Sequence, residues 1–183
     1  GKYFRRFDSY FFPEDIVHYF NSKKEFLNVL LGKIKKDIIY CPRNEIGWQE
    51  VDGFKEMFPE IQYDIKRRFI DLMRKAKIAV VDHPATAFLE ALTINAPTVL
   101  YWDHDIFHMR TEAEPYFQSL RDSGILYKNP VSAAEKINEI YDDPMEWWHS
   151  NTVQSARKEF CDRFAYARKD WLDVWVKELR KYI

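Results

Sequence analysis

Short apolar runs alternate with stretches of helical periodicity along most of the chain. Four runs rich in β-branched and aromatic residues predict strands: IIY at 38–40, KIAVVD at 77–82, PTVLYWD at 97–103 and ILY at 125–127. Because parallel strands are joined by helical crossovers, strands that alternate with helices predict repeated βαβ units and a parallel sheet.

Between these strands, apolar positions recur every three or four residues. This period predicts helices over 64–76, 84–95, 114–124 and 132–143. Gly124 is expected to end the third of these helices, because glycine is favoured just after a helix. Ser132 is predicted to cap the fourth, since Glu135 completes a capping box with it.

The two ends of the chain show further helical patterns. Residues 1–37 are predicted to be an aromatic lead-in and then a helix capped by Ser22, with Glu25 as its box partner. From Thr152 to Val174 an apolar stripe holds helical period, which predicts a long helix that packs in the core or against another domain. The Gly-punctuated stretch at 43–54 is predicted to be a loop of functional length.

These patterns together predict an α/β fold, a Rossmann-like parallel sheet with helices on both faces and additional C-terminal helices. Three segments are expected: 1–37 as the N-terminal lead-in and helix, 38–143 as the nucleotide-binding core, and 144–183 as the helical extension. The chain opens on Gly1 rather than Met, so we interpret it as a piece of a longer protein.

Composition narrows the class of function. The 183 residues are 46% hydrophobic and 31% charged, which indicates a globular chain, and the net charge of -1 argues against nucleic acid as a partner. Cys41 and Cys161 fit no metal-binding or redox spacing, which favours free thiols and a cytoplasmic location. Without a GxSxG elbow, a Walker loop or GxGxxG, hydrolase, ATPase and dehydrogenase functions lack support.

The stretch DHPAT at 82–86 joins a predicted strand to a predicted helix. Pro84 suits the first helical position, so His83 is predicted to be the N-cap and Thr86 the third helical residue. A helix start is a phosphate-binding position, to which Thr86 adds a hydroxyl. Glu90 lies one turn further on the same side, where it would reach a ribose. The alternative is that His83 is a plain cap, Thr86 a first-turn residue and Glu90 a solvated acid.

Further polar and aromatic residues follow the other strands. Arg43 would neutralise a phosphate and Trp48 would stack on a base or sugar, or they are an exposed arginine and a core tryptophan. Trp102 and Asp103 stand at the end of a predicted strand and are predicted to line the donor pocket. Asp103 and Asp105 also form Asp-x-Asp, a weak signal for a divalent metal, and a zinc site at His104 and His108 is less favoured than exposed loop histidines. We expect no metal and no cofactor.

The order strand, DHPAT, helix, Glu, Leu, Asn-x-Pro and strand resembles the carboxyl-terminal half of GT-B glycosyltransferases and, more distantly, the teichoic-acid glycerophosphotransferases. In those families a Ser or Thr at the helix start touches the donor phosphates and an acid one turn on touches the ribose, and here Thr86, Glu90 and Pro97 hold the corresponding places. Several pieces are also similar to a family of bacterial surface-carbohydrate biosynthesis transferases: RNEIGW at 43–48, DHPATAFLEAL at 82–92, NAPTVLYWD at 95–103, SGIL at 123–126 and EWW at 146–148. The resemblance covers about residues 38–165.

This resemblance implies the donor-binding domain of a metal-independent glycosyltransferase that makes a bacterial surface polysaccharide. The expected partners are a nucleotide-sugar donor, the missing N-terminal half of the same enzyme and, through the full-length protein, the membrane periphery. The chain departs from the GT-B pattern in one respect, because its 5 glycines do not form a glycine-rich turn before the helix. Two alternatives stay open: a non-catalytic Rossmann-like interaction module, and a metal-dependent transferase that uses Asp103 and Asp105.

Overall fold

The computed structural model describes residues 13–42, 50–104 and 106–182. Its strands are β1 (Ile39–Tyr40), β2 (Gln62–Tyr63), β3 (Ala79–Val81), β4 (Thr98–Tyr101) and β5 (Leu126–Tyr127), and every pairing between them is parallel. The four strands predicted from the apolar runs are all present, whereas the short β2 was not predicted. The α/β fold class with a parallel, Rossmann-like sheet is confirmed.

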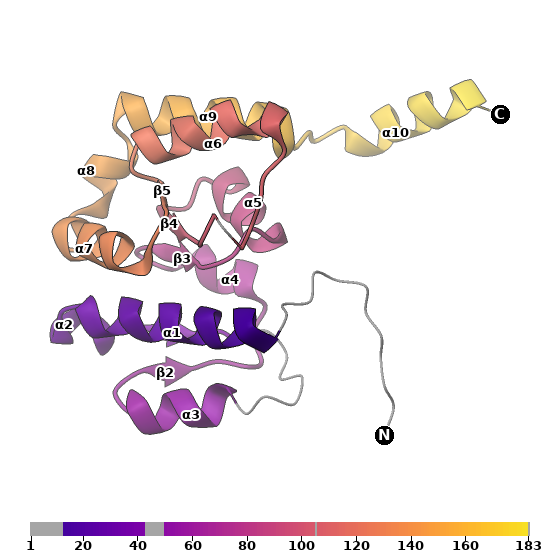
Figure 1. Ribbon diagram of the computed structural model, residues 1–183. Coiled ribbons are helices and arrows are strands. Elements are labelled where there is room, and N and C mark those ends of the chain that lie inside the picture. Colours follow the sequence, from indigo (N-terminus) through magenta and orange to yellow (C-terminus); the bar gives the residue numbers. More distant parts are fainter. Residues whose placement is uncertain (1–12, 43–49, 105, 183) are drawn as a thin grey trace, which may run out of the picture.

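The strands form two groups, and the order in which strands are added to the sheet reverses between them. β1 pairs with β2, and β3, β4 and β5 pair in that order. Figure 1 shows β2 on the β3 side of the larger sheet, and the contacts of Lys23 with Tyr40 of β1 and with Asp82 after β3 put β1 between β2 and β3. The strand order therefore proceeds from β1 to β2 in one direction and from β3 to β5 in the other. In open parallel sheets, ligands bind at the carboxyl ends of the strands where this reversal occurs.

The alternation of side chains along β4 divides the core into two layers. Val99 and Tyr101 face one hydrophobic cluster, while Leu100 and Trp102 face the other. All four residues of β4 are buried, as expected for a central parallel strand covered on both faces.

Helices cover both faces of the sheet (Figure 1). On the Val99 face the core is shared by α1 (Pro13–Val29), α3 (Glu50–Met57) and α7 (Pro130–Ile140). On the Leu100 face it is shared by α5 (Thr86–Thr93), α6 (Glu114–Asp122) and α9 (Asn151–Phe164). The shorter elements are α2 (Gly32–Lys35), α4 (Phe69–Met73), α8 (Pro144–Trp148) and the 3-10 turns Thr111–Ala113 and Arg180–Tyr182. No described helix is long and apolar enough to cross a membrane.

Several helix starts differ from the prediction. α1 begins at Pro13, so Ser22 lies inside the helix and does not cap it. α7 begins at Pro130, because the Asn129 side chain accepts the Ser132 N–H and takes the capping role assigned to Ser132. Glu50 opens α3, so residues 50–54 of the predicted loop at 43–54 are helical, and residues 43–49 lie outside the described residues.

The helix predicted at 64–76 is reduced to α4. The Asp64 carboxylate accepts the backbone N–H groups of Lys66 and Arg67, which holds this stretch in a turn. Such local side-chain bonds compete with helix formation. The amphipathic pattern alone therefore overestimated the length of this helix.

The long C-terminal helix predicted from the stripe at 153–174 is also wrong. α9 ends at Phe164, Ala165 leaves helical geometry, and a separate helix, α10, spans Trp171–Leu179. Only the first part of the stripe, from Val153 to Cys161, enters the core. Of the residues between the two helices, Ala165 packs against the core, whereas Arg168, Lys169 and Asp170 are exposed.

The end of α6 provides a test of backbone strain. Gly124 follows the helix with φ of 74°, as its predicted role requires, and a Cβ there would lie 3.2 Å from Tyr127 Oη. We predict that Gly124→Ala lowers the free energy of unfolding by roughly 1–2 kcal/mol, because L side chains are disfavoured at positive φ. Gly32→Ala is the matched control, since a Cβ there meets nothing within 4 Å. Equal urea midpoints for the two variants would contradict this.

Candidate functional site

Lys23 of α1 contacts residues at the ends of β1 and β3, the two strands between which the strand order reverses. Lys23 Nζ donates to Tyr40 Oη at 2.9 Å, at the end of β1, and lies 3.6 Å from Asp82 Oδ2, directly after β3. The Lys23 side chain is 9% exposed and that of Asp82 19%. The part of α1 around Lys23 therefore reaches the carboxyl ends of β1 and β3, while Phe26, Leu27 and Leu30 pack on the Val99 face of the sheet.

Asp82 is the centre of a hydrogen-bond network. Tyr19 Oη donates to Asp82 Oδ1 at 2.9 Å, and His83 Nδ1 lies 2.8 Å from the same oxygen. Burial alone would raise the pKa of the Asp82 carboxyl, but the Lys23 charge and the bonds from His83 and Tyr19 outweigh burial and hold this pKa well below its ordinary range. Asp82 is thus an anion at neutral pH.

This network determines how His83 can act. With a carboxylate against Nδ1, the proton of a neutral His83 ring belongs on Nδ1, which leaves Nε2 as an acceptor. The His83 side chain is 24% exposed, so a bound molecule can reach it. An imidazole oriented by a carboxylate can accept a proton or hydrogen-bond a ligand hydroxyl.

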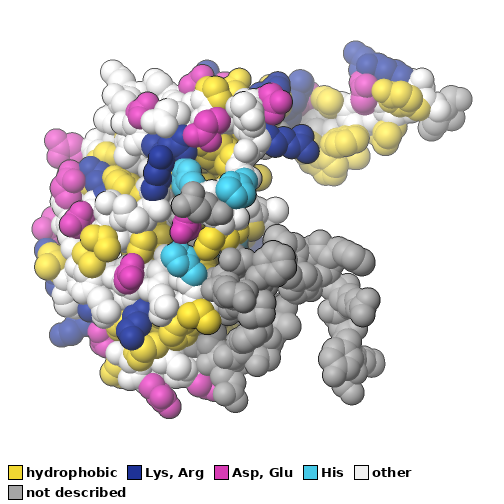
Figure 2. All heavy atoms as spheres, viewed as in Figure 1, with side chains coloured by type: hydrophobic (Ala, Val, Ile, Leu, Met, Phe, Trp, Pro, Cys, Tyr) yellow, Lys and Arg dark blue, Asp and Glu magenta, His cyan; other side chains and the backbone are white. Residues whose placement is uncertain are grey.

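Two further histidines lie near the carboxyl end of β4. His18 Nε2, on α1, lies 3.0 Å from Asp103 Oδ2, just after β4. His104 Nδ1 lies 3.5 Å from a guanidinium nitrogen of Arg121, and burial, followed by the Arg121 and Lys128 charges, lowers the His104 pKa. Figure 2 shows histidine side chains gathered on the face between α1 and α6, near acidic and basic groups.

Trp102, predicted to line the donor pocket, lies in the core. Its side chain packs between Phe88 and Phe117, at ring-centroid distances of 5.6 and 6.2 Å, and the residue is 2% exposed. Its Nε1 has no hydrogen-bond partner among the described residues. In this conformation Trp102 does not face an open surface.

The start of α5 differs from the prediction in detail. Three bent residues, 83–85, follow β3, and Ala85 N donates to His83 O at 2.9 Å. The helix begins at Thr86 with Ala85 in the N-cap position, so His83 is not the cap and Thr86 is the first helical residue rather than the third. No side chain caps this helix start, and the N–H groups of Thr86 and Ala87 precede the first bond of the helix, in which Phe88 N donates to Ala85 O at 3.3 Å.

Thr86 and Glu90 line the same surface depression, of about 310 Å³. Its remaining wall is largely apolar and comes from α4, α5 and the residue after α9: Ile70, Leu89, Thr93, Ile94 and Ala165. Thr93 Oγ1 donates to Ala165 O at 3.4 Å across one end of it. The structure therefore brings Thr86 and Glu90 together along α5, with His83 three residues before Thr86.

Three other predicted residues are not placed by the structure. Arg43, Trp48 and Asp105 lie outside the described residues. Within the described ranges, no group of three His, Cys, Asp or Glu side chains is arranged to hold a metal ion.

Neither cysteine has a reactive environment. Burial, then the Asp64 charge, raises the pKa of Cys41 to about 11, and burial also raises the pKa of Cys161. Both thiols therefore stay protonated at neutral pH, which argues against a thiolate nucleophile at either position.

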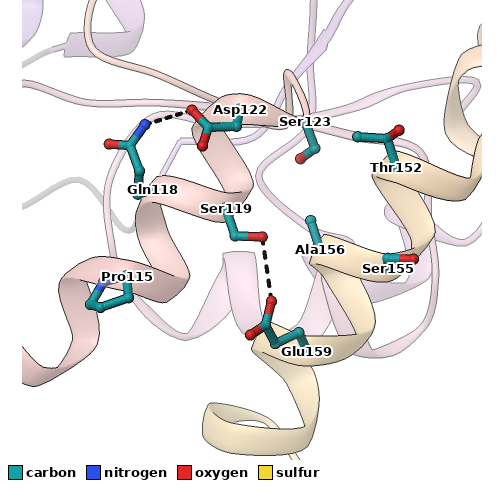
Figure 3. Close-up of a pocket in the computed structure, with 9 residues that line it drawn as sticks. All are labelled: Pro115, Gln118, Ser119, Asp122, Ser123, Thr152, Ser155, Ala156 and Glu159. Carbon is teal, nitrogen blue, oxygen red and sulfur yellow. Dashed lines mark hydrogen bonds between the residues drawn. The ribbon is translucent and has the colours of Figure 1, made fainter.

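A second depression, of about 490 Å³, lies between α6 and α9 (Figure 3). Polar side chains line most of it, and Ser119 Oγ donates to Glu159 across it at 3.4 Å. Its lining residues come from two surface helices and not from strand ends, so it lies outside the position where open parallel sheets bind ligands.

Sequence reasoning missed Tyr19, Lys23 and Tyr40. Lys23 lies at helical spacing from Phe26, Leu27 and Leu30, which are all buried. A lysine within an apolar stripe is the available signal, because buried lysines are rare unless paired. Its partner, 59 positions away, could not be identified from this pattern.

We predict that Lys23→Met lowers the free energy of unfolding by about 3–5 kcal/mol at pH 7. Removing the cation leaves the ionised Asp82 largely buried without its main partner, and broken buried pairs cost this much. Urea unfolding measures the change, with Lys24→Met, at the exposed neighbouring position, as the matched control. Two variants of equal stability would contradict a structural role for the pair.

The Asp82 pKa generates a pH prediction. Because its pKa in the folded protein lies below the unfolded value, ionised Asp82 contributes stability above about pH 4, and this is lost as pH falls through the folded pKa. The stability difference between wild type and Asp82→Asn should therefore be largest near neutrality and shrink on acidification. Asp142→Asn, at an exposed carboxyl, should give a smaller difference at every pH. A wild-type advantage that persists unchanged in acid would contradict this account.

Comparisons with known proteins place these observations in a family. No curated protein and no solved structure matches the chain. The model of one family, the LIC12162 family transferases, matches residues 1–179, nearly the whole sequence. The chain therefore belongs to the LIC12162 family of transferases.

Proposed function

We propose that this chain binds the nucleotide-sugar donor of a glycosyltransferase in bacterial surface polysaccharide biosynthesis, without a metal ion. The observation that carries the proposal is the shared depression of Thr86 and Glu90, which begins where α5 leaves the carboxyl end of β3. Membership of a transferase family supports group transfer as the reaction class. The glycosyl donor and the polysaccharide product are our own extension.

The start of α5 would bind the diphosphate. The N–H groups of Thr86 and Ala87, at an uncapped helix start, and the partial positive charge of the helix favour an anion there, and the exposed Thr86 hydroxyl adds a donor. His83, held by Asp82, lies on the approach to the same helix start. Its imidazole can hydrogen-bond a phosphate oxygen or a sugar hydroxyl.

Glu90 and the apolar wall would bind the nucleoside. A carboxylate one turn along the helix is suited to accept hydrogen bonds from ribose hydroxyls. Leu89 and Ile94 offer an apolar surface for one face of a base. A volume of about 310 Å³ lies at the small end of ligand pockets, so the sugar would extend beyond it towards the carboxyl edge of the sheet.

In this proposal the helix start stabilises the departing diphosphate electrostatically. Preorganised backbone donors act where negative charge develops, and they need no reorganisation during the reaction. Asp103 is engaged by His18 at 3.0 Å, so the proposal gives it a structural role at the edge of the site. The acceptor-binding groups would come from another part of the enzyme.

We predict that a nucleoside diphosphate sugar binds with an affinity that falls at least tenfold, ~1.4 kcal/mol, in Thr86→Ala and in Glu90→Gln. Calorimetric titration with UDP-, GDP- and CDP-sugars and with CMP-sugars, in EDTA, identifies the nucleotide. Thr152→Ala and Glu159→Gln, which line the α6–α9 depression, are matched controls and should bind normally.

Other outcomes would favour the alternatives. Binding that requires Mn²⁺ and is unaffected by the Thr86 and Glu90 variants would favour a metal-dependent transferase that uses Asp103 and Asp105. Absence of binding to every nucleotide would contradict the donor-binding proposal and favour an interaction module. Loss of binding in the Thr152 and Glu159 variants would place the site between α6 and α9.

A further inference from the structure

The C-terminal helix α10 lies away from the rest of the protein. Figure 1 shows it joined to α9 by an extended stretch and projecting from the body. None of its residues is buried, and Trp171, Trp175 and Leu179 are 59%, 59% and 53% exposed. So much exposed apolar surface on one short helix indicates a binding surface.

The side chains of α10 separate into two faces. Trp171, Trp175 and Leu179 follow one another at intervals of four residues, so they lie along one side of the helix. Leu172 and Val176 lie next to this row. Figure 2 shows hydrophobic side chains along one side of the projecting helix and basic side chains along the opposite side near its end.

Basic residues precede and follow α10, whereas the helix itself carries Lys177 against Asp173 and Glu178. Residues 163–182 contain six basic side chains against three acidic ones, a net charge of +3, whereas the whole chain carries -1. The six are Arg163, Arg168, Lys169, Lys177, Arg180 and Lys181. Two of the acids are paired locally, Asp170 with Arg168 and Glu178 with Lys181. This stretch would therefore be drawn to an anionic surface.

We propose that α10 binds the surface of an anionic lipid bilayer, lying in the plane of the interface. Nine residues are too few to cross a bilayer, but an apolar face with tryptophans, preceded and followed by basic residues, suits the interface of an anionic bilayer. Tyr166 and Tyr182, 65% and 80% exposed, flank the helix, and Trp and Tyr side chains favour the headgroup region.

A pairing of two copies fits these residues less well. Helices that pair in water usually present a narrow row of aliphatic residues, with charges on both flanks. The apolar sector of α10 is wide and contains two tryptophans, and the basic residues near it lie mostly before and after the helix rather than alongside the row. The lipid surface is therefore the occupant that the charge and the aromatic content favour.

The position of α10 has a consequence for the site. Ala165, the first residue after α9, lines the depression of Thr86 and Glu90, and its carbonyl accepts from Thr93. Five residues later the polar lead-in to α10 ends at Asp170. A bilayer bound by α10 would thus lie close to the proposed donor site, although the lipid proposal does not depend on that site.

The test measures co-sedimentation of the full 183-residue chain with vesicles. Vesicles of phosphatidylcholine with phosphatidylglycerol should bind it, and pure phosphatidylcholine vesicles should bind it far less. Trp171→Ser with Trp175→Ser should reduce partitioning at least a hundredfold, because burying a large apolar side chain is worth about tenfold or more. Lys177→Glu with Arg180→Glu should reduce it at least tenfold, since one basic residue near an anionic surface is worth about fivefold.

Matched controls lie elsewhere on the protein. Ile65→Ser removes a 72% exposed apolar side chain away from α10, and Lys24→Glu with Lys36→Glu makes the same charge change at exposed positions. Neither control should reduce partitioning of the chain to vesicles as far as the α10 variants do. On binding, tryptophan emission should shift to shorter wavelength and be quenched by brominated lipid.

Three results would overturn the proposal. The first is no binding to phosphatidylglycerol vesicles by the folded wild-type chain. The second is equal binding by the α10 variants and the controls. The third is a wild-type dimer in light scattering that Trp171→Ser with Trp175→Ser converts to monomer, without vesicle binding by either protein, which would assign α10 to a second copy of the chain.

Discussion

The ion pair between Lys23 and Asp82 is the constraint on which the arrangement of the site depends. It fastens α1 to the ends of β1 and β3, two strands that are not hydrogen-bonded to each other in the described structure. A largely buried pair adds little net stability compared with well-packed apolar groups, because both charges must lose their water. Its value lies in geometry, since removing either partner leaves a charge that the surrounding protein cannot solvate.

The charge of Asp82 affects other groups along the carboxyl edge of the sheet. Asp82 remains ionised, and its negative charge, second to burial, contributes to holding the pKa of Tyr101 well above its ordinary value. The same carboxylate orients His83, and the parallel contact of His18 with Asp103 extends the arrangement to β4. Helix α5 then begins beside this fixed edge without a side-chain cap. A polar edge of this kind, next to an apolar wall on α5, is suited to a ligand with an anionic and an aromatic part.

The sequence allowed the fold to be predicted because hydrophobic patterning is local. The strands at 79–81 and 98–101 are short continuous apolar runs, and the spacing of Thr86 and Glu90 on one helical side follows from the period alone. Trp102 could not be assigned in this way. A strand buried on both faces has no polar alternation to show which side a residue takes, and Trp102 faces the core.

The remaining differences come from interactions that local patterns do not contain. The network of Tyr19 with Asp82 joins residues 63 positions apart, and it forms only because α1 packs across the strand ends. His83 loses its predicted capping role because the chain bends for three residues before α5 begins. The stripe on 153–174 keeps its period through a break that places α10 outside the core, so an unbroken pattern did not mean an unbroken helix.

The central claim, that a nucleotide-sugar binds where α5 leaves β3, is tested most directly by mapping a bound nucleoside diphosphate sugar with amide chemical shifts. The account predicts that the largest changes occur at the amides of residues 83–90, with smaller ones along the Tyr19–Lys23 turn of α1. Changes confined to the α6–α9 depression, or no changes at saturating nucleotide, would contradict it.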